Sequence, residues 1–300
     1  MQEFIMLIGI PGCGKSTFSA KLQEQGYIWL SSDSIRNELN LHGQEYNAQV
    51  FDIMHKRMIE NLNDGKSVVY DSTNLSRKNR FNVLERLNKI PCKKICYMFI
   101  VPLEVCMERN AQRDGYARVP DELFNKMLCT YNPPMLSEGF DEIRPIVYDG
   151  EFEIDDYDNL DNFDQDNPHH SHSLGEHMRS AYEYVKQNTS DVLVLEATKY
   201  HDIGKIYTKS YTNFKGEPSE KAHFYGHDNY GAYMYLIRWA KLQNMSFEDA
   251  LYVSQLIGFH MRPLLSWKHS EKARAKDRKF MSEKFYNDLL LLHDGDMNAH

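Results

Sequence analysis

Residues 4–17 of the chain read FIMLIGIPGCGKST. The apolar run at 4–10 ends in a glycine-rich turn, which is typical of a strand buried on both faces of a parallel sheet. Helix-favouring residues follow from Lys15 to Gln25, and Gly26 is a stop signal. A strand, a GxxxxGKS loop and a helix in this order are the context in which a phosphate-binding loop (P-loop) forms.

The residues of this loop have separate expected roles toward a nucleoside triphosphate. Glycines let the backbone wrap around the phosphates, and the amide groups at the helix N-terminus supply partial positive charge. Lys15 is expected to reach the β- and γ-phosphates, and Ser16 is expected to hold Mg²⁺. The expected cofactor is therefore ATP, or another nucleoside triphosphate, with Mg²⁺. The loop residues expected to bind it are Gly9, Gly12, Cys13, Gly14, Lys15, Ser16 and Thr17.

Strand and helix signals alternate through the rest of the first 150 residues. A helix is predicted at 47–63, and another between the third and fourth strands. Further strands are predicted at 27–30, 67–70, 94–101 and 143–148. This alternation predicts an α/β domain whose parallel sheet is covered by helices on both faces.

Charged residues that follow the strands are candidates for catalysis and ATP binding. Asp33 follows the second strand, where a carboxylate can accept the proton of an attacking hydroxyl group, and Arg36 can hold a phosphate with two hydrogen bonds. Asp71 ends the third strand and can orient the metal or the acceptor. Arg109 and Arg113 are predicted to share a helix face and to neutralise charge on ATP. The alternatives are caps or turns for the aspartates and a solvated basic face for the arginines.

Residues 1–150 resemble the kinase domain of the bacteriophage polynucleotide 5′-kinase family. The resemblance is carried by GIPGCGKST, by a DxxR pair, by DSTN at 71–74 and by RNAQR followed by a Val-Pro pair. It implies that Asp33 is the general base for a 5′-hydroxyl group and that Arg36 binds the substrate phosphate. It also implies that Arg109 and Arg113 contact ATP from a lid. Small-metabolite kinases share several of these motifs.

Length and charge indicate how the chain is organised. Three hundred residues, 42% of them hydrophobic, predict about two packed domains. The net charge of −8 lies in residues 151–168, which contain eight acidic residues and no lysine or arginine. We expect a flexible acidic linker here, between domains at 1–150 and 169–300. Five cysteines without CxxC spacing, and no transmembrane or secretion signal, favour a cytoplasmic protein without a membrane partner.

Helical spacing without convincing strand signals predicts an all-α domain at 169–300. A basic run at 268–284 is either a track for a phosphate backbone or a solvated loop.

The most informative feature is His201-Asp202, which lies at a predicted helix end, where both side chains can bind one divalent cation. Sites that mix histidine and carboxylate suit Mn, Fe, Ni, Co or Mg. The predicted helices are at 175–187, 191–203, 229–243, 247–259 and 283–299.

This C-terminal part resembles the HD phosphohydrolase superfamily, through the ordered pattern H…HD…H…H…D. The residues that match the pattern are His177, His201, Asp202, His227, His260 and Asp296. The resemblance implies that the two carboxylates and the first two histidines bind one metal. The other two histidines would bind a second metal or the phosphate, and Lys205 in HDIGK would contact the phosphate. Asp294 is the alternative to Asp296. Weaker candidates for the pocket are His169, His170, His172 and His223.

Together, the two resemblances predict a bifunctional enzyme that heals nucleic-acid ends, as in RNA repair. One domain would phosphorylate 5′-hydroxyl groups, and the other would remove a 3′-phosphate or open a 2′,3′-cyclic phosphate. The expected partners are RNA or DNA ends, with a nucleic-acid ligase as a candidate protein partner. One alternative is a nucleoside or nucleotide kinase fused to an HD nucleotidase. The other is a nucleotide-gated binding module without turnover.

Overall fold

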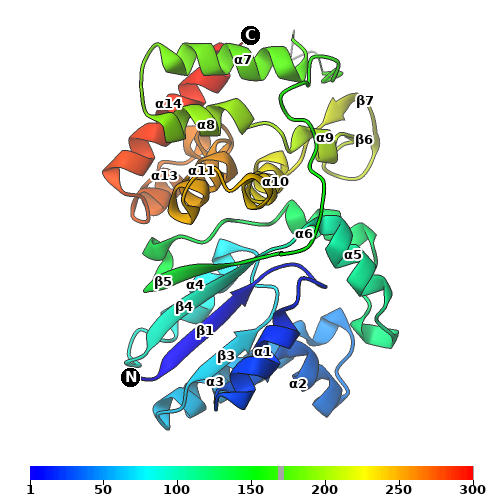
Figure 1. Cartoon of the computed structure of the whole chain (residues 1–300), viewed down its shortest axis with the longest axis vertical. Coiled ribbons are helices and arrows are strands. Elements are labelled where there is room, and N and C mark those ends of the chain that lie inside the picture. The colour runs from blue at the N-terminus through cyan, green and yellow to red at the C-terminus, as the bar shows by residue number, and fades with distance from the viewer. Residues whose placement is uncertain (168–171, 300) are drawn as a thin grey trace. The chain divides into compact units, whose positions relative to one another are not determined.

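The structure is a computed structural model that describes residues 1–167 and 172–299. It divides into two compact units (Figure 1). Unit 1 comprises Met1–Met127 and Pro134–Gly150, and unit 2 comprises Leu128–Pro133 and Glu151–His300. Among the described residues, no helix combines the length and the apolar character needed to cross a membrane.

Unit 1 is built on a five-stranded sheet in which all paired strands are parallel. The strand order is β2-β3-β1-β4-β5. Phe4 to Ile8 in β1 are all buried, because neighbouring strands flank β1 on both edges and helices cover its faces. The predicted α/β domain with a parallel sheet is confirmed. The strands are β1 (Glu3–Ile8), β2 (Ile28–Ser31), β3 (Val68–Asp71), β4 (Lys93–Ile100) and β5 (Glu142–Val147).

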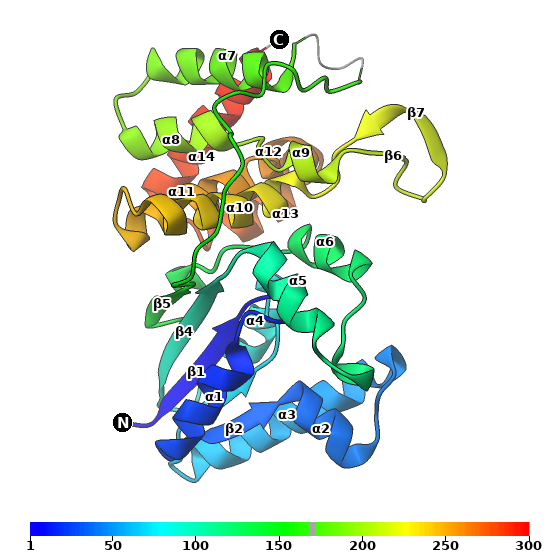
Figure 2. The same ribbon diagram turned by 45° about the vertical axis from the view of Figure 1, so that its right-hand side comes forward.

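The helices of unit 1 lie on both faces of this sheet. The β1–β2 and β3–β4 connections run in opposite directions across it, and right-handed crossovers therefore place α1 and α4 on opposite faces (Figures 1 and 2). Strand β1 lies between β3 and β4, where the connections from one strand to the next change direction across the sheet. The loop after β1 therefore lies at the topological switch point, which is where open α/β sheets bind ligands. The helices are α1 (Lys15–Glu24), α2 (Ser32–Leu39), α3 (Asn47–Asn63), α4 (Arg77–Glu85), α5 (Leu103–Ala111) and α6 (Glu122–Leu128).

Unit 2 is mainly helical, but the prediction of an all-α domain is wrong in one place. Strands β6 (Ser210–Thr212) and β7 (Pro218–His223) form an antiparallel hairpin. The sequence obscures this hairpin because its strands are short and polar and lack apolar alternation. The helices are α7 (Leu174–Lys186), α8 (Val192–Tyr200), α9 (Lys205–Thr208), α10 (His227–Leu242), α11 (Phe247–Phe259), α12 (Arg262–Leu265), α13 (Glu271–Arg278) and α14 (Glu283–Asn298).

The basic run at 268–284 is not the solvated loop that was one expectation. Nearly half of it is helix α13, and Ser270 caps this helix by accepting a hydrogen bond from the amide of Ala273 at 3.2 Å. At the end of the run, the Lys284 ammonium lies 2.6 Å from carboxylate oxygens of both Asp191 and Asp288. Part of this basic charge is therefore paired within unit 2.

Residues 151–167, which we call the strap, contain no helix or strand but are not a free spacer. Tyr157 in the strap is buried, and its hydroxyl lies 2.7 Å from that of Tyr207. The carboxylate of Asp158 lies 2.6 Å from the Lys199 ammonium, and the Phe163 carbonyl accepts from the Leu174 amide at 3.0 Å. The predicted flexible linker is wrong over these residues, because cations and hydroxyl groups of unit 2 match the acidic groups. Pro168, the last residue of that linker, lies outside the described residues.

A short segment that precedes residue 150 packs into unit 2. The Cys129 carbonyl accepts a hydrogen bond from the Asn229 side chain at 3.0 Å, and the Tyr131 ring packs edge-on against Tyr233 at 5.3 Å. The predicted boundary at 150 assigns these residues to the first domain. Residues 128–133 instead contribute to the core of unit 2.

Candidate active sites

The loop after β1 has the backbone conformation of a phosphate cradle. Gly12 has φ +81°, and a Cβ atom there would lie 2.2 Å from the Cys106 carbonyl oxygen, so this position requires glycine. Helix α1 begins at Lys15, directly after the loop, and its first amide groups face the cradle. The adjoining pocket has a volume of about 420 Å³. Among the residues that line it are Gly12, Cys13, Gly14, Ser16, Thr17, Arg109 and Arg113.

Lys15 lies against this loop. Its ammonium donates hydrogen bonds to the carbonyl oxygens of Gly9 and Ile10, at 2.9 Å each. The side chain is 9% exposed, and so its charge is held in a largely water-excluded place. A charge in this position strengthens the attraction of the cradle for phosphate oxygens.

Asp71 ends β3 and is held by two side chains that the motif analysis did not identify. Its carboxylate Oδ2 accepts hydrogen bonds from Ser19 Oγ at 3.2 Å and from Trp29 Nε1 at 3.1 Å. Burial raises the pKa of Asp71, against the opposing charge of Lys15. The alternative role of Asp71 as a helix cap does not apply to α4, because Ser76 caps that helix.

Asp33 and Arg36 lie on α2, beyond the end of β2. The cap of this helix is Ser31, which leaves Asp33 in the first turn with an exposed side chain. The Arg36 guanidinium donates to the carbonyl oxygens of Leu41 and Gly43, at 3.1 Å each, and it also contacts the side chain of Asn47. In this conformation, Arg36 orders the loop after α2. Binding a substrate phosphate would require it to exchange at least part of this network.

Arg109 and Arg113 do not share a helix face, contrary to expectation, because α5 ends at Ala111. The Arg109 guanidinium lies 3.5 Å from the Gly12 carbonyl oxygen and 5.4 Å from the centre of the Tyr148 ring. Arg113 lies in the following turn and contacts the Ala117 carbonyl at 3.4 Å. Both arginines still line the pocket of the P-loop.

Asn110 fixes the loop that follows α5, a role that the motif analysis missed. Its side chain is fully buried, donates to the Val119 carbonyl at 2.7 Å and accepts from the Val119 amide at 3.0 Å. A buried asparagine beside a predicted lid was the available signal, because an amide side chain can mimic one rung of a β-ladder. Asn110 therefore closes the loop that carries Arg113.

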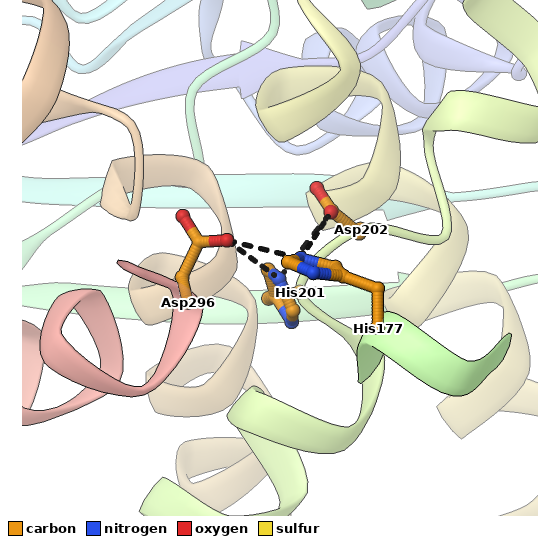
Figure 3. A group of neighbouring side chains, drawn as sticks. All are labelled: His177, His201, Asp202 and Asp296. Atoms are coloured by element: carbon orange, nitrogen blue, oxygen red, sulfur yellow. Dashed lines mark hydrogen bonds and ion pairs between the residues drawn. The ribbon is translucent and has the colours of Figure 1, made fainter. Parts of the chain in front are cut away.

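A second candidate site lies in unit 2, where the ends of five helices meet. Four of its side chains point toward one another in Figure 3, and His227 and His260 complete the group. Gly204 allows α10 to approach, because a Cβ atom there would lie 1.9 Å from the His227 carbonyl oxygen. The ligand candidates come from α7 (His177), the end of α8 (His201 and Asp202), the start of α10 (His227), the end of α11 (His260) and α14 (Asp296).

The backbone fixes the orientation of all four imidazole rings. Each Nδ1 lies within hydrogen-bond distance of a carbonyl oxygen: Ala299 for His177, Thr198 for His201, Phe224 for His227 and Ile257 for His260, at 2.7–2.9 Å. A carbonyl oxygen only accepts hydrogen bonds, so each Nδ1 carries the proton. In the neutral rings, every Nε2 then presents a lone pair to the centre of the site, as metal-ligating histidines do.

These Nε2 atoms converge on two carboxylates. His177 Nε2 lies 3.0 Å from Asp296 Oδ1 and 3.3 Å from Asp202 Oδ2. His227 Nε2 lies 3.1 Å from Asp202 Oδ1, and His260 Nε2 lies 3.5 Å from the same oxygen. Asp202 thus belongs to two ligand groups, one with His177, His201 and Asp296, and the other with His227 and His260.

The charges of the site fit a divalent cation. Burial alone would raise the pKa of Asp202, but Lys205 and His201 hold that pKa well below its usual range. The Nε2 atom of His201 is buried and makes no hydrogen bond to a described residue, although two carboxylates lie within 3.5 Å. Two anionic carboxylates and an unsatisfied nitrogen are the donor set that Mn, Fe, Ni or Co prefers. Within each of the two groups, the candidate ligand atoms lie within 4.8 Å of one another.

The remaining candidates of unit 2 lie around this cluster or away from it. The Lys205 ammonium is buried and lies 2.7 Å from Asp202 Oδ2. Asp294 is exposed on α14, whereas Asp296 lies in the cluster. His223 lines the adjoining pocket. His172 lies on the surface, with its Nδ1 atom 3.9 Å from Glu176 Oε2. His169 and His170 lie outside the described residues.

Comparison with known proteins bears on the first unit. Residues 4–134 match the family model described as an AAA domain. The N-terminal part of the chain has a P-loop kinase-like fold. We call unit 1 the kinase-like unit from here on. Residues 151–299 lie outside this match, and their helical fold is consistent with an HD domain without establishing one.

Curated relatives also align with about the first half of the chain. The chain is 26% identical over 136 residues to the L-seryl-tRNA(Sec) kinase of Methanococcus maripaludis, covering 43% of this chain and 52% of that protein. It is 24% identical over 151 residues to the bifunctional polynucleotide phosphatase/kinase of Schizosaccharomyces pombe, covering 49% of this chain and 34% of that protein. It is 29% identical over 154 residues to UMP-CMP kinase 2 of Caenorhabditis elegans, covering 44% of this chain and 78% of that protein. The chain thus spans about half or less of the first two relatives.

Proposed function

We propose that the chain is a bifunctional enzyme for nucleic-acid ends, which phosphorylates 5′-hydroxyl groups and removes 3′-phosphates or opens 2′,3′-cyclic phosphates. The kinase-like unit would perform the first reaction with ATP and Mg²⁺. The histidine–aspartate cluster of unit 2 would perform the second. The observation that carries the hydrolase half is the convergence of four backbone-oriented Nε2 atoms on Asp202 and Asp296.

In the kinase reaction, this chain's residues would mainly position and neutralise charge. Lys15 and the loop amides would hold the β- and γ-phosphates, while Ser16 and Asp71 would hold Mg²⁺ directly or through water. Asp33 has an exposed carboxylate at the end of the sheet that carries the P-loop, and it would accept the proton of the attacking hydroxyl. Arg109 lies between the P-loop and Tyr148, from where it would contact ATP.

In the hydrolase reaction, the two ligand groups around Asp202 would hold one or two divalent ions. Such an ion supplies Lewis-acid polarisation of a phosphoryl oxygen. The Nδ1 hydrogen bonds keep the four rings in one orientation, and burial excludes bulk water from His201 and His260. Lys205 Nζ lies 2.7 Å from Asp202 Oδ2, from where it would orient the phosphate against the cluster.

Separation of function tests both halves in the full chain. Lys15→Ala and Asp33→Asn should abolish labelling of a 5′-hydroxyl oligonucleotide with ATP and Mg²⁺ and should leave release of a 3′-phosphate intact. His201→Ala and Asp202→Ala should do the opposite. If wild-type protein cannot label the oligonucleotide, the kinase half of the proposal is wrong. If it releases no phosphate from 3′-phosphate or cyclic-phosphate ends with Mn²⁺, Ni²⁺, Co²⁺ or Mg²⁺, the hydrolase half is wrong.

A second candidate is a small-molecule kinase fused to a nucleotidase. The similarity to a UMP-CMP kinase over 78% of that relative's length favours it. Competition between a 5′-hydroxyl oligonucleotide and mononucleosides or nucleoside monophosphates distinguishes the two candidates. Preferential phosphorylation of the small acceptor would favour the alternative.

A further inference from the structure

Solvent-exposed aromatic rings lie on the β6–β7 hairpin of unit 2 and on the residues that follow it. Phe214, in the turn, is 88% exposed, and Tyr225, just after β7, is 45% exposed. The two rings pack edge-to-face with centroids 5.9 Å apart. Tyr225 in turn stacks on His223, with ring centres 5.2 Å apart and planes inclined by 9°. Contiguous exposed rings of this kind are candidates for an interaction site.

This row of rings leads into the pocket above the metal-ligand cluster. The pocket has a volume of about 620 Å³, within the range of small-ligand sites. Its polar floor includes Asp202, His227 and Asp296, and Lys205 lies beside it. The ring of Phe224 lies 5.6 Å from the Lys205 ammonium. The apolar wall consists of Phe224, Tyr225, Met261, Leu264, Leu265 and Met297.

Two chemistries are therefore adjacent in one cavity. A metal ion held by the carboxylates and histidines of the floor would bind a phosphate group, and the wall and mouth offer flat or apolar surface. Leu265 and Met297 at the wall are 63% and 41% exposed, so the opening itself is apolar. A nucleotide has this combination, with a phosphate on one side and an aromatic base on the other. Stacking on an aromatic side chain suits every base, because each presents a π-face.

We propose that His223, Tyr225 and Phe214 form a stacking platform for the bases that precede the 3′-phosphate of a single-stranded nucleic acid. This inference rests on the proposed phosphohydrolase function and specifies its substrate class. One base would enter the pocket beside Tyr225, and the next would lie on the exposed rings outside it. Such an arrangement selects strand ends over duplex ends, because paired bases cannot splay onto the rings.

The test uses the full chain with Mn²⁺ and two single-stranded oligonucleotides. Each carries a radioactive 5′-phosphate, which blocks the kinase reaction, and a 3′-phosphate. In one strand the two 3′-terminal nucleosides lack their bases. We expect wild-type protein to bind the strand with all its bases about tenfold more tightly in a filter-binding assay. Phe214→Ala and Tyr225→Ala should remove most of that difference.

Two further variants control for general effects of substitution. Tyr225→Phe keeps the ring and should keep the preference. Leu242→Ala removes an exposed apolar side chain at the end of α10 that does not line the pocket, and it should also keep the preference. Equal affinity for both strands in wild-type protein, or a preference that survives both ring-removing substitutions, would overturn the inference.

Release of the unlabelled 3′-phosphate from the same strands, measured separately as inorganic phosphate, distinguishes failure of this inference from failure of the proposed phosphohydrolase function. If both strands are hydrolysed and bound equally, the stacking platform is wrong and the phosphohydrolase function stands. If binding depends on the bases but no strand loses its phosphate with any of the metals, the platform is supported and the phosphohydrolase function is wrong.

Discussion

The side-chain oxygen of Gln165 accepts a hydrogen bond from the Lys205 ammonium at 2.8 Å. Gln165 belongs to the strap and is 1% exposed, while Lys205 begins α9 next to the metal-ligand cluster. The same amide group donates to the His172 carbonyl at 3.1 Å, which fixes its orientation. The acidic strap is therefore part of the candidate hydrolase site, because it holds the lysine that we expect to orient the phosphate.

Gln165→Ala should weaken phosphate recognition in the hydrolase reaction. Lys205 would keep Asp202 as a partner but lose the neutral acceptor that directs its Nζ atom. We expect a hydrogen bond to a charged group to contribute about 1.5–3 kcal/mol, which corresponds to a rise in KM of about tenfold or more. Steady-state kinetics with a 3′-phosphate oligonucleotide, and inhibition by inorganic phosphate, measure this effect.

The matched control for Gln165 lies on the same strap. Asp161→Ala removes an exposed ion pair with Arg179 and should leave the hydrolase parameters unchanged. Labelling of 5′-hydroxyl ends should be unaffected by either substitution. If Gln165→Ala lowers both activities to the same extent, or leaves the KM of the hydrolase reaction unchanged, Gln165 does not position Lys205 for phosphate.

Trp29→Phe should slow the kinase reaction without unfolding the protein. The substitution keeps a ring in place but removes the Nε1 donor, and Asp71 then keeps Ser19 as a donor to its Oδ2. Loss of about 0.5–1.5 kcal/mol of orientation energy corresponds to a fall in kcat of about twofold to tenfold. The measurement is kcat for 5′-labelling as a function of Mg²⁺ concentration.

The same substitution in unit 2 controls for loss of an indole group. Trp239 Nε1 donates to the Met245 carbonyl at 3.0 Å, so Trp239→Phe also removes one indole hydrogen bond. It should leave the kinase kcat unchanged. Equal kinase rates for Trp29→Phe and wild-type protein at limiting Mg²⁺ would show that Asp71 does not need this donor.

Breaking the buried ion pair between Arg80 and Glu138 should destabilise the kinase-like unit. Both side chains are fully buried, and two N···O distances of 2.7 Å join them. Arg80 also donates to the carbonyl oxygens of Asn74 and Leu75, at the turn after β3. Glu138→Ala leaves a buried guanidinium without its counter-ion and should lower the free energy of unfolding by about 3–5 kcal/mol.

Urea unfolding followed by circular dichroism measures this effect. The double variant Arg80→Leu/Glu138→Leu removes both charges, and it should lose less stability than Glu138→Ala alone, because no unpaired charge stays buried. A double variant that is less stable than the single variant would show that the backbone contacts of Arg80 matter more than its charge.

Metal binding to the cluster in unit 2 should release protons at neutral pH. Burial alone would lower the pKa of His201, but the carboxylates of Asp202 and Asp296 raise that pKa to about 10. The imidazole is therefore protonated at neutral pH in metal-free protein, whereas a metal requires its neutral form. Affinity for Mn²⁺ should rise with pH toward 10. Titration calorimetry in two buffers with different ionisation enthalpies measures the released protons, and identical enthalpies would contradict the prediction.

The same shift in pKa makes metal-free stability depend on pH in a defined direction. The folded-state pKa of His201 lies above the ordinary value of 6.5. Protonated His201 therefore stabilises the metal-free fold fully below pH about 6.5, and this contribution is lost as the pH rises through about 10. His201→Gln should flatten this dependence in thermal unfolding experiments with a chelator. An unchanged slope would mean that another group is responsible.

Local sequence patterns predicted most regular elements of the kinase-like unit. The buried run at 4–10 and the helix that starts at Lys15 follow from apolar periodicity and glycine position, which act over a few residues. The metal-ligand candidates of unit 2 were also predictable as a set, since His177, His201 and Asp296 match an ordered pattern. The predicted helix face shared by Arg109 and Arg113 was wrong, because the helix ends between them.

The partners of these residues came only from the tertiary structure. Trp29 reaches Asp71 across 42 residues of sequence, and Gln165 reaches Lys205 across 40. The polar β6–β7 hairpin and the packed strap likewise have no periodic signal in the sequence. Hydrogen bonds to side chains and carbonyl groups stabilise them, and these contacts do not require alternating apolar residues. The sequence by itself determined which groups are available for chemistry. Long-range hydrogen bonds, which leave no local pattern, decided how those groups are oriented and which neighbours set their charge.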